Sequence, residues 1–313
     1  MPPPVPLFLA GSTAVGKSAV ALRLAELLDG EVISVDSMQV YRGLDIGTAK
    51  PSPTERQRVP HHLIDVADLS ESFDAARFIQ LAQTALEEIQ ARGRVPIFCG
   101  GTGLYFKAFL EGLGEAPPTD PRVRSELENT PLPALLAELE KFDPVAFAKI
   151  DRQNPRRVIR ALEVIRLTGK PFSAQRANWA ATATPATSGA GPFFVLTRAP
   201  SNLQRRIDAR VEEMFRCGLV AETDNLLARG LAQNRTAMQA IGYRQVVEHL
   251  RGERPLPATI ELVKIRTKQF AKRQLTWFRR HARAAWISLE PAISADEAAA
   301  RLATNYRAAH SSA

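Results

Sequence analysis

A glycine-rich segment near the start of the chain carries residue types that bind phosphate. Gly11, Gly16, Lys17 and Ser18 satisfy the spacing G-x-x-x-x-G-K-[ST]. In such a loop the glycines let backbone N–H groups turn inward onto phosphate oxygens, and the lysine adds a positive charge. The serine hydroxyl is a typical ligand of Mg²⁺. The pattern therefore predicts a phosphate-binding loop, but it suits a diphosphate ester as well as ATP.

The segments around this loop are the ones that position such a loop in known proteins. An apolar run, residues 5–10, precedes it, and a helical pattern of alanines and leucines, residues 19–28, follows it. Strand, glycine turn and helix in this order point the positive end of the helix at the bound phosphate. We therefore expect the loop at the edge of a parallel sheet where strands end.

Two further segments should reach the same edge. Residues 31–36 predict a second buried strand, rich in apolar β-branched residues, that ends on Asp36, and residues 95–99 form a third apolar run that leads into Gly100-Gly101-Thr102-Gly103. Because the carboxyl ends of parallel strands line a common crevice, Asp36 and Thr102 should face the contents of the phosphate loop. An aspartate followed by serine is also typical of a turn cap, so both roles stay open for Asp36.

The composition indicates a soluble globular protein with an anionic partner. The chain has 313 residues, of which 45% are hydrophobic, and a net charge of +8. No apolar run approaches the roughly 20 residues of a membrane span, and no secretory signal is evident, so we expect a cytoplasmic protein with no membrane contact. Cys99 and Cys217 are too few for a disulfide framework, and we expect both to be buried.

The positive charge is concentrated in one segment. Residues 251–283 contain ten basic and two acidic residues, which equals the net charge of the whole chain. A helical pattern at residues 258–283 mixes these cations with Phe270, Trp277 and Phe278, an arrangement that suits RNA, because bases stack on aromatic rings while phosphates pair with cations. An amphipathic helix with a packed aromatic face gives the same pattern. Another helix is expected at residues 238–250.

The middle of the chain differs from both ends. Residues 114–191 hold proline-introduced helical patterns without a strand pattern, and close in an Ala/Thr/Ser/Gly/Pro tract at 180–191 that is typical of a linker. We expect a helical insertion at 114–191 and an α/β core formed by 1–113 and 192–313, which carries the basic C-terminal helices. Arg156 and Arg160 share a helix face in the insertion, which fits phosphate contact or simple solvation.

Seven sequence motifs together match one protein family. They are GSTAVGKS at 11–18, ISVDSMQVY at 33–41, DIGTAKP at 45–51, GGTGLY at 100–105, RALEV at 160–164, AIGYRQ at 240–245 and KRQLTWF at 272–278. The chain thereby resembles the bacterial tRNA dimethylallyltransferases of the IPP transferase family, over residues 5 to about 289. It departs at Ser12, where the family usually has proline, and because the residue contributes only backbone there we expect no change in chemistry.

The resemblance implies a P-loop, nucleotide-kinase-like parallel sheet with a helical insertion domain. It implies transfer of a dimethylallyl group from dimethylallyl diphosphate to N6 of adenosine 37, beside the anticodon of tRNA, with release of diphosphate and a need for Mg²⁺. The insertion would contact the tRNA, and the protein would act as a monomer. On this interpretation the phosphate loop holds the diphosphate of the donor and no nucleoside triphosphate takes part.

The resemblance also implies roles for particular residues. Asp36 would orient N6 and accept its proton, while Lys17, Arg210 and Mg²⁺ on Ser18 would stabilise the departing diphosphate, and Thr102 would donate a hydrogen bond. The implied donor-binding residues are Gly11, Ser12, Thr13, Ala14, Val15, Gly16, Lys17 and Ser18. The implied tRNA-binding residues are Asp36, Ser37, Met38, Gln39, Thr102, Arg124, Arg156, Arg157, Val158, Ile159, Arg160, Gln239, Ala240, Ile241, Gly242, Tyr243 and Arg244.

Other classes of protein fit parts of the sequence. A nucleoside or shikimate-type kinase shares the loop and the sheet but has no use for a long basic aromatic helix. A non-catalytic RNA-binding protein would explain the charge but not the pairing of Lys17 with Asp36. Prenylation of free adenine nucleotides is the nearest alternative chemistry, and the phrases of the C-terminal third argue against it.

Overall fold

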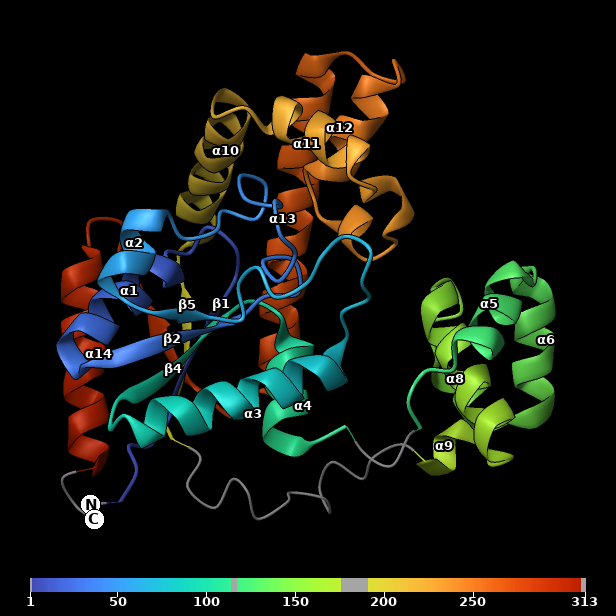
Figure 1. The fold of residues 1–313 in the computed structure, drawn as a ribbon, viewed down its shortest axis with the longest axis horizontal. Coiled ribbons are helices and arrows are strands. Elements are labelled where there is room, and N and C mark those ends of the chain that lie inside the picture. Colours follow the sequence, from blue (N-terminus) through green and yellow to red (C-terminus); the bar gives the residue numbers. More distant parts are fainter. Residues whose placement is uncertain (1, 114–116, 176–190, 311–313) are drawn as a thin grey trace. The chain divides into compact units, whose positions relative to one another are not determined.

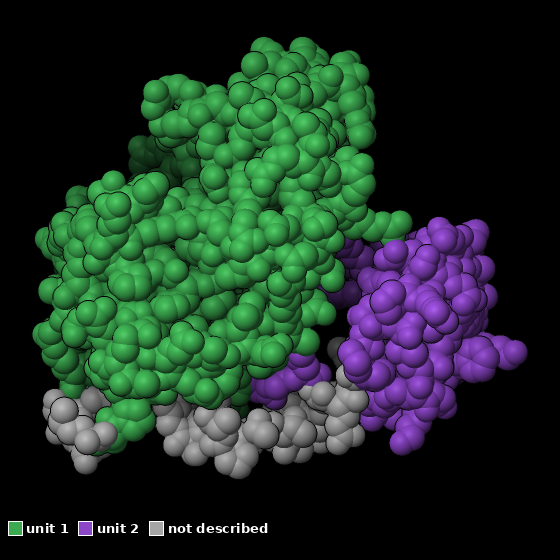
Figure 2. All heavy atoms as spheres, in the orientation of Figure 1, with its two compact units in different colours: residues 1–110, 188–313 green, residues 111–187 purple. Residues whose placement is uncertain are grey.

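The computed structural model describes residues 2–113, 117–175 and 191–310 (Figure 1). The chain divides into two compact units, one formed by residues 1–110 and 188–313 and the other by residues 111–187 (Figure 2). The sequence placed these boundaries at 114 and 191. The linker expected at 180–191 lies outside the described residues, apart from Gly191.

The larger unit is built on a sheet in which every neighbouring pair of strands is parallel. Its strand order, over the described residues, is β3-β2-β4-β1-β5-β6. The strands are β1 (Leu7–Gly11), β2 (Gly30–Val35), β3 (His61–His62), β4 (Val95–Gly100), β5 (Phe193–Thr197) and β6 (Ala285–Ser288). This arrangement confirms the α/β class, and it places the segments that follow β1, β2, β4 and β5 along one edge of the sheet.

Alternation along β1 divides the core into two layers. Leu7 and Leu9 belong to the cluster formed with α1 (Lys17–Leu28) and α14 (Ala295–His310). Phe8 belongs to the opposite cluster, with α3 (Ala75–Ala91) and α4 (Gly103–Glu111) (Figure 1). Both faces are therefore buried, which explains why the central strands are continuous apolar runs rather than alternating ones.

Four α-helices lie between β5 and β6 in the described residues and extend the larger unit. They are α10 (Pro200–Arg216), α11 (Leu219–Ala228), α12 (Tyr243–Leu250) and α13 (Leu256–His281). The long helix α13 packs against α10 and α12, and α11 packs against α12. Two lysines of α13 bond to carboxylates of α10, Lys264 to Glu212 at 2.8 Å and Lys268 to Asp208 at 2.7 Å. Part of the expected basic face of α13 therefore holds the helix in place.

Several local expectations were wrong for identifiable reasons. The helix expected at 238–250 begins only at Tyr243, because Gly242 has φ = 102° and only a 3-10 turn precedes it. The polar, proline-rich sequence of residues 48–60 predicts a surface loop, but it contains a short helix, because Ser52 and Glu55 form a capping box that starts α2 (Pro53–Arg58). Cys217 follows the end of α10 and is exposed, whereas Cys99 is buried as expected.

The smaller unit consists of helices in the residues that the structure describes. They are α5 (Pro121–Asn129), α6 (Leu132–Phe142), α7 (Pro144–Lys149), α8 (Pro155–Thr168) and α9 (Phe172–Gln175). Leu127, Leu139 and Leu162 form its core. The buried Asp143 carboxylate accepts hydrogen bonds from the backbone of Ala146 and Ser173, and thereby joins the start of α7 to α9. Across both units, none of the helices described combines the length and the apolar character of a membrane span.

Candidate active site

The phosphate loop has the backbone geometry that its sequence predicts. Strand β1 ends at Gly11 and α1 begins at Lys17. Gly16, with φ = 107°, and Ala14, with φ = 61°, both lie in the left-handed region, where a side chain is strained and glycine is not. Ser18, in the first turn of α1, is exposed. The loop thus presents backbone N–H groups and the positive end of α1 at the carboxyl edge of the sheet.

Two arginines hold the loop through its carbonyl groups. Arg198, directly after β5, donates from Nε to the carbonyl of Val15 at 2.8 Å, and Arg206 of α10 donates from Nε to the carbonyl of Ala14 at 2.8 Å. Sequence reasoning missed both roles. Their positions in the sequence could have indicated these roles. Arg198 directly follows a strand, as Asp36 does, and Arg206 precedes Arg210 by one helical turn and so lies on the same face of the helix.

Lys17, Asp36 and Arg210 are brought into electrostatic range of one another. Burial lowers the pKa of the Lys17 ammonium, Arg210 shifts it in the same direction, and Asp36 opposes both. Burial likewise lowers the pKa of the Arg210 guanidinium, again opposed by Asp36. Among the described residues, no carboxylate lies within salt-bridge distance of Arg198, Arg206 or Arg210. This excess of positive charge around a phosphate loop suits a multiply charged anion.

Asp36 performs the structural role left open by the sequence and retains an oxygen for chemistry. Its Oδ1 accepts hydrogen bonds from the backbone N–H groups of Met38 at 2.9 Å and Gln39 at 3.3 Å, as in a turn cap. The described residues form no hydrogen bond or ion pair with Oδ2. One carboxylate oxygen thus fixes the turn after β2, and the other remains available to a substrate.

Thr102 joins the second glycine turn to the turn that follows β2. Its backbone N–H donates to the carbonyl of Val35 at 3.2 Å, and its Oγ1 accepts from the backbone N–H of Ser37 at 3.1 Å. Because the hydroxyl oxygen is used as an acceptor, the hydroxyl hydrogen stays available as a donor. Thr102 therefore lies beside the Asp36 turn with a free O–H group.

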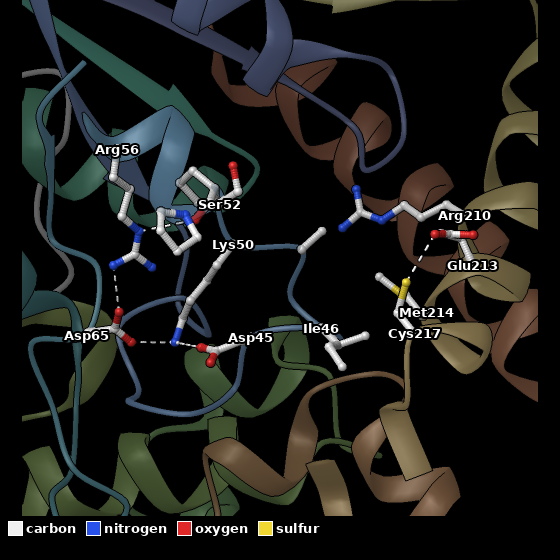
Figure 3. Close-up of a pocket in the computed structure, with 13 residues that line it drawn as sticks. Asp45, Ile46, Lys50, Ser52, Arg56, Asp65, Arg210, Glu213, Met214 and Cys217 are labelled. Carbon is white, nitrogen blue, oxygen red and sulfur yellow. Dashed lines mark hydrogen bonds and ion pairs between the residues drawn. The ribbon is translucent and has the colours of Figure 1, made fainter. Parts of the chain in front are cut away.

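A cavity of about 780 Å³ adjoins Arg210 (Figure 3). Its charged wall is internally neutralised, because Lys50 pairs with Asp45 at 2.7 Å and with Asp65 at 2.5 Å, and Arg56 pairs with Asp65 at 2.8 Å. The other lining residues include Ile46, Ala49, Pro51, Pro53 and Met214. The volume is in the range of small-molecule sites, and the mixture of apolar wall and single unpaired guanidinium suits an apolar group attached to an anion.

One wall of this cavity is fixed by residues far away in the sequence. The Glu222 carboxylate accepts from the backbone N–H of Ile46 at 3.0 Å and from the Tyr243 hydroxyl at 2.5 Å. The same hydroxyl accepts from the backbone N–H of Gly47 at 3.1 Å. Burial and the neighbouring Glu222 raise the pKa of Tyr243, so the phenol keeps its proton. Glu222 was missed by sequence reasoning, since nothing local reveals a partner 176 residues away.

The residues expected to bind tRNA in the larger unit differ in accessibility. Gln239 and Arg244 are exposed, whereas Ala240 and Tyr243 are buried, Gly242 is buried and Ile241 is half-buried. The side-chain amide of Gln39 is occupied, since it accepts from Ser34 and donates to the carbonyls of Thr48 and Ala49. The buried Tyr243 side chain thus supports this surface from within, whereas the half-buried Gln39 is held in place by its hydrogen bonds.

The expected tRNA-binding residues of the smaller unit divide in the same way. Arg124 and Arg160 both pair with the buried carboxylate of Glu163, at 3.4 and 2.7 Å. Val158 and Ile159 are buried in the core of this unit. Arg156 and Arg157 are exposed. Only part of the expected set therefore presents its side chains to solvent.

The described residues contain no cluster of three or more His, Cys, Asp or Glu side chains suited to a metal ion. The Ser18 hydroxyl is exposed and forms no hydrogen bond with the described residues. A metal ion at this loop would therefore take most of its ligands from a bound phosphate compound and water, which is how Mg²⁺ is commonly held in phosphate-binding sites.

The chain is similar to known proteins over most of its length. Residues 39–281 match the family described as IPP transferase. The chain is 45% identical over 286 residues to tRNA dimethylallyltransferase 1 of Trichlorobacter lovleyi, covering 90% of this chain and 93% of the relative. It is also 45% identical over 307 residues to the tRNA dimethylallyltransferase of Methylococcus capsulatus, covering 95% and 96%.

Solved structures give the same result. The full-length tRNA isopentenylpyrophosphate transferase of Bacillus halodurans superposes with a TM-score of 0.70 at 40% identity and covers 96% of this chain and 95% of that one. A eukaryotic dimethylallyltransferase described as acting on tRNA gives a TM-score of 0.75 at 31% identity, covering 91% and 73%. The resemblance stated from the sequence is thus confirmed, and the chain belongs to the IPP transferase family.

Proposed function

We propose that this protein transfers a dimethylallyl group from dimethylallyl diphosphate to N6 of adenosine 37 in tRNA. The observation that carries the proposal is that Lys17, Asp36 and Arg210 lie within electrostatic range of one another beside the phosphate loop. Relatives that match nearly the whole chain are named for this activity. In the reaction the N6–C1 bond forms as the C1–O bond breaks, the N6 proton passes to a base, and diphosphate leaves.

The donor side of the site would bind and stabilise the diphosphate. The N–H groups of the phosphate loop and the Lys17 ammonium bind its oxygens, and Arg210 approaches from α10. Negative charge grows on the diphosphate as the C1–O bond breaks, so donors fixed in advance lower the barrier. Mg²⁺ held by the Ser18 hydroxyl and the diphosphate oxygens would neutralise part of this charge. Arg198 and Arg206 add positive potential from behind the loop.

The acceptor side would activate a weak nucleophile. The lone pair of an exocyclic adenine amine is delocalised into the ring, so a base that takes its proton lowers the barrier. We assign this role to the Oδ2 atom of Asp36, while the Thr102 hydroxyl donates a hydrogen bond to the base. Adenosine 37 must leave its stack to reach these groups, so we expect it to be flipped out of the anticodon loop.

The hydrocarbon of the donor would occupy the cavity beside Arg210. The side chains of Ile46 and Met214 give it an apolar surface, and the Lys50 ammonium on the same wall is neutralised by its ion pairs with Asp45 and Asp65. In this arrangement one arginine contacts the diphosphate at the mouth of the cavity in which the prenyl group lies.

The direct test is incubation of the full chain with labelled dimethylallyl diphosphate and an unmodified tRNA that carries adenosines at positions 36 to 38. We expect the label to appear in the tRNA, and transfer to stop when a chelator removes divalent metal. Hydrolysis of ATP in place of prenyl transfer would favour a kinase. Label on free AMP at a comparable rate would favour the prenylation of free nucleotides.

We expect tRNA affinity to fall steeply with salt. Lys272, Arg273, Arg279 and Arg280 are exposed on α13, and each phosphate contact contributes roughly −0.7 to −0.9 to the slope of log K against log salt, so these four alone predict a slope of about −3. Fluorescence anisotropy over a salt series measures it. Arg280→Ala should flatten the slope by about one contact, whereas Lys268→Ala, which removes a paired lysine, should change it less. A slope near zero would contradict the RNA-binding proposal.

Arg210→Ala should lower kcat by about 10²-fold with little change in the KM for tRNA, because its partner is charge that develops as the C1–O bond breaks. Steady-state kinetics with both substrates measure the split. A donor with a better leaving group should partly restore the rate, since less charge then needs stabilising. Arg205→Ala, an exposed arginine on the same helix, serves as the matched control. A change confined to the KM for tRNA would refute the assignment.

A further inference from the structure

A single glutamine of the long helix α13 connects the two glycine loops of the site. The Gln274 side chain is buried, and its Oε1 accepts from the backbone N–H of Thr13 at 2.9 Å. Its Nε2 donates to the backbone carbonyl of Gly101 at 3.0 Å. Thr13 belongs to the phosphate loop and Gly101 to the turn after β4. One amide group therefore bridges the donor loop and the second loop.

The packing around this bridge is tight at two glycines of the turn. A Cβ atom at Gly101 would lie 2.3 Å from Nε2 of Gln274, and a Cβ at Gly103 would lie 2.1 Å from the Trp277 ring. A Cβ at Gly103 would overlap the Trp277 ring, and a Cβ at Gly101 would displace the Gln274 amide from its hydrogen bonds, so the observed approach of α13 requires that both positions lack a side chain. The glycines of this turn are thus explained by Gln274 and Trp277, and the turn fits against one face of α13.

The bridge continues to the acceptor carboxylate. Gly101 precedes Thr102, whose Oγ1 accepts from the backbone N–H of Ser37, the residue after Asp36. Every link in this series is a hydrogen bond or a peptide bond. The Gln274 amide therefore adds a side-chain connection between the phosphate loop and the Asp36 turn, in addition to the pairing of β1 and β2 with β4.

We propose that Gln274 is a positioning residue that fixes the separation between the donor diphosphate and the acceptor base. The inference rests on the proposed function, and it concerns a residue that touches neither substrate. Reacting atoms must approach to about 3–3.5 Å in line, and a displacement of about 1 Å can cost on the order of 10²-fold in rate. Glutamine offers, at this length, one donor and one acceptor on the same rigid plane without a need for protonation.

Substitutions of similar size separate positioning from packing. Gln274→Met fills the same space without either hydrogen bond, and it should lower kcat by about 10²-fold while the KM values for donor and tRNA change little. Gln269→Met, at an exposed position of the same helix, should retain the kcat of the unaltered chain. Thermal unfolding of each variant shows whether the fold persists.

Gln274→Glu gives a signature that packing alone cannot produce. An ionised carboxylate still accepts from Thr13 but repels the Gly101 carbonyl, whereas a protonated carboxyl both donates and accepts, as the amide does. Burial raises the pKa of a carboxyl group, so the protonated form is reached as pH falls. The kcat of Gln274→Glu, divided by that of the unaltered chain at the same pH, should therefore rise as pH is lowered.

The outcomes are distinct. No transfer by the unaltered chain overturns the proposed function and this inference together. If the unaltered chain transfers the prenyl group and Gln274→Met is equally active, this inference alone is overturned. The same holds if the lower kcat of Gln274→Glu does not depend on pH. A variant that loses thermal stability but keeps its kcat when folded also overturns it, because Gln274 would then be only structural.

Discussion

Replacing Lys17 by alanine should nearly abolish prenyl transfer while tRNA affinity stays almost unchanged. Lys17 is the residue of the phosphate loop that brings a full charge to the diphosphate; it is half-buried, and burial lowers the pKa of its ammonium. A charge is worth more in such surroundings than in water, so we expect a loss on the order of 10³-fold or more in kcat/KM for the donor. Single-turnover transfer measures the loss, and anisotropy measures tRNA binding.

The same variant tests whether donor and acceptor are bound separately. Because Lys17 follows the β1 loop and the exposed cations of α13 lie on a different element, removing it should leave the salt dependence of tRNA binding as it was. Lys141→Ala, at an exposed position of the smaller unit, is a control for the loss of one lysine. If tRNA binding by Lys17→Ala collapses instead, the two substrates share this residue and the division is wrong.

Asp36→Asn should lower kcat by on the order of 10²–10⁴-fold, the usual contribution of a general base. The substitution is selective because Oδ1, which accepts from Met38 and Gln39, has a counterpart in the asparagine carbonyl, so the turn after β2 persists. Only Oδ2 is replaced, by an amide that cannot take a proton. Rapid-quench kinetics measure the chemical step directly, and tRNA affinity should survive.

The response to the leaving group separates Asp36 from Arg210. A donor with a better leaving group relieves a defect on the diphosphate side but not the missing base, so it should rescue Arg210→Ala in part and Asp36→Asn not at all. If both variants respond equally, the assignment of a base to one side and an electrostatic clamp to the other fails.

The parts of the site that depend on local pattern were predictable. Strand, glycine turn and helix around Lys17 are specified by neighbouring residues, and the carboxyl ends of β2 and β4 followed from two apolar runs. The β3 strand has two residues and no hydrophobic pattern, so it carried no signal. Gln274 and Glu222 were not predictable in their roles, because each acts on backbone groups far away in the sequence.

The number of cations in a segment does not show how many of them are unpaired in the folded chain, and the reason is physical. Lys264 and Lys268 contribute to the basic composition of α13, yet carboxylates of α10 pair with them once the helices pack. Arg124 and Arg160 are similarly committed to Glu163. A sequence shows how many cations a segment has, whereas the fold determines which of them form ion pairs with carboxylates of the same chain.

The strand order also bears on how a nascent chain folds. β1 pairs with β4 on one side and with β5 on the other, where Phe8 lies opposite Phe193. β1 is therefore synthesised early, but its partner β5 is synthesised only after the whole smaller unit. Until then one edge of β1 is unpaired, and it is an apolar edge that other chains could join. Pairings so distant in sequence form slowly. Folding of the larger unit should therefore complete late in translation, after β5 has left the ribosome.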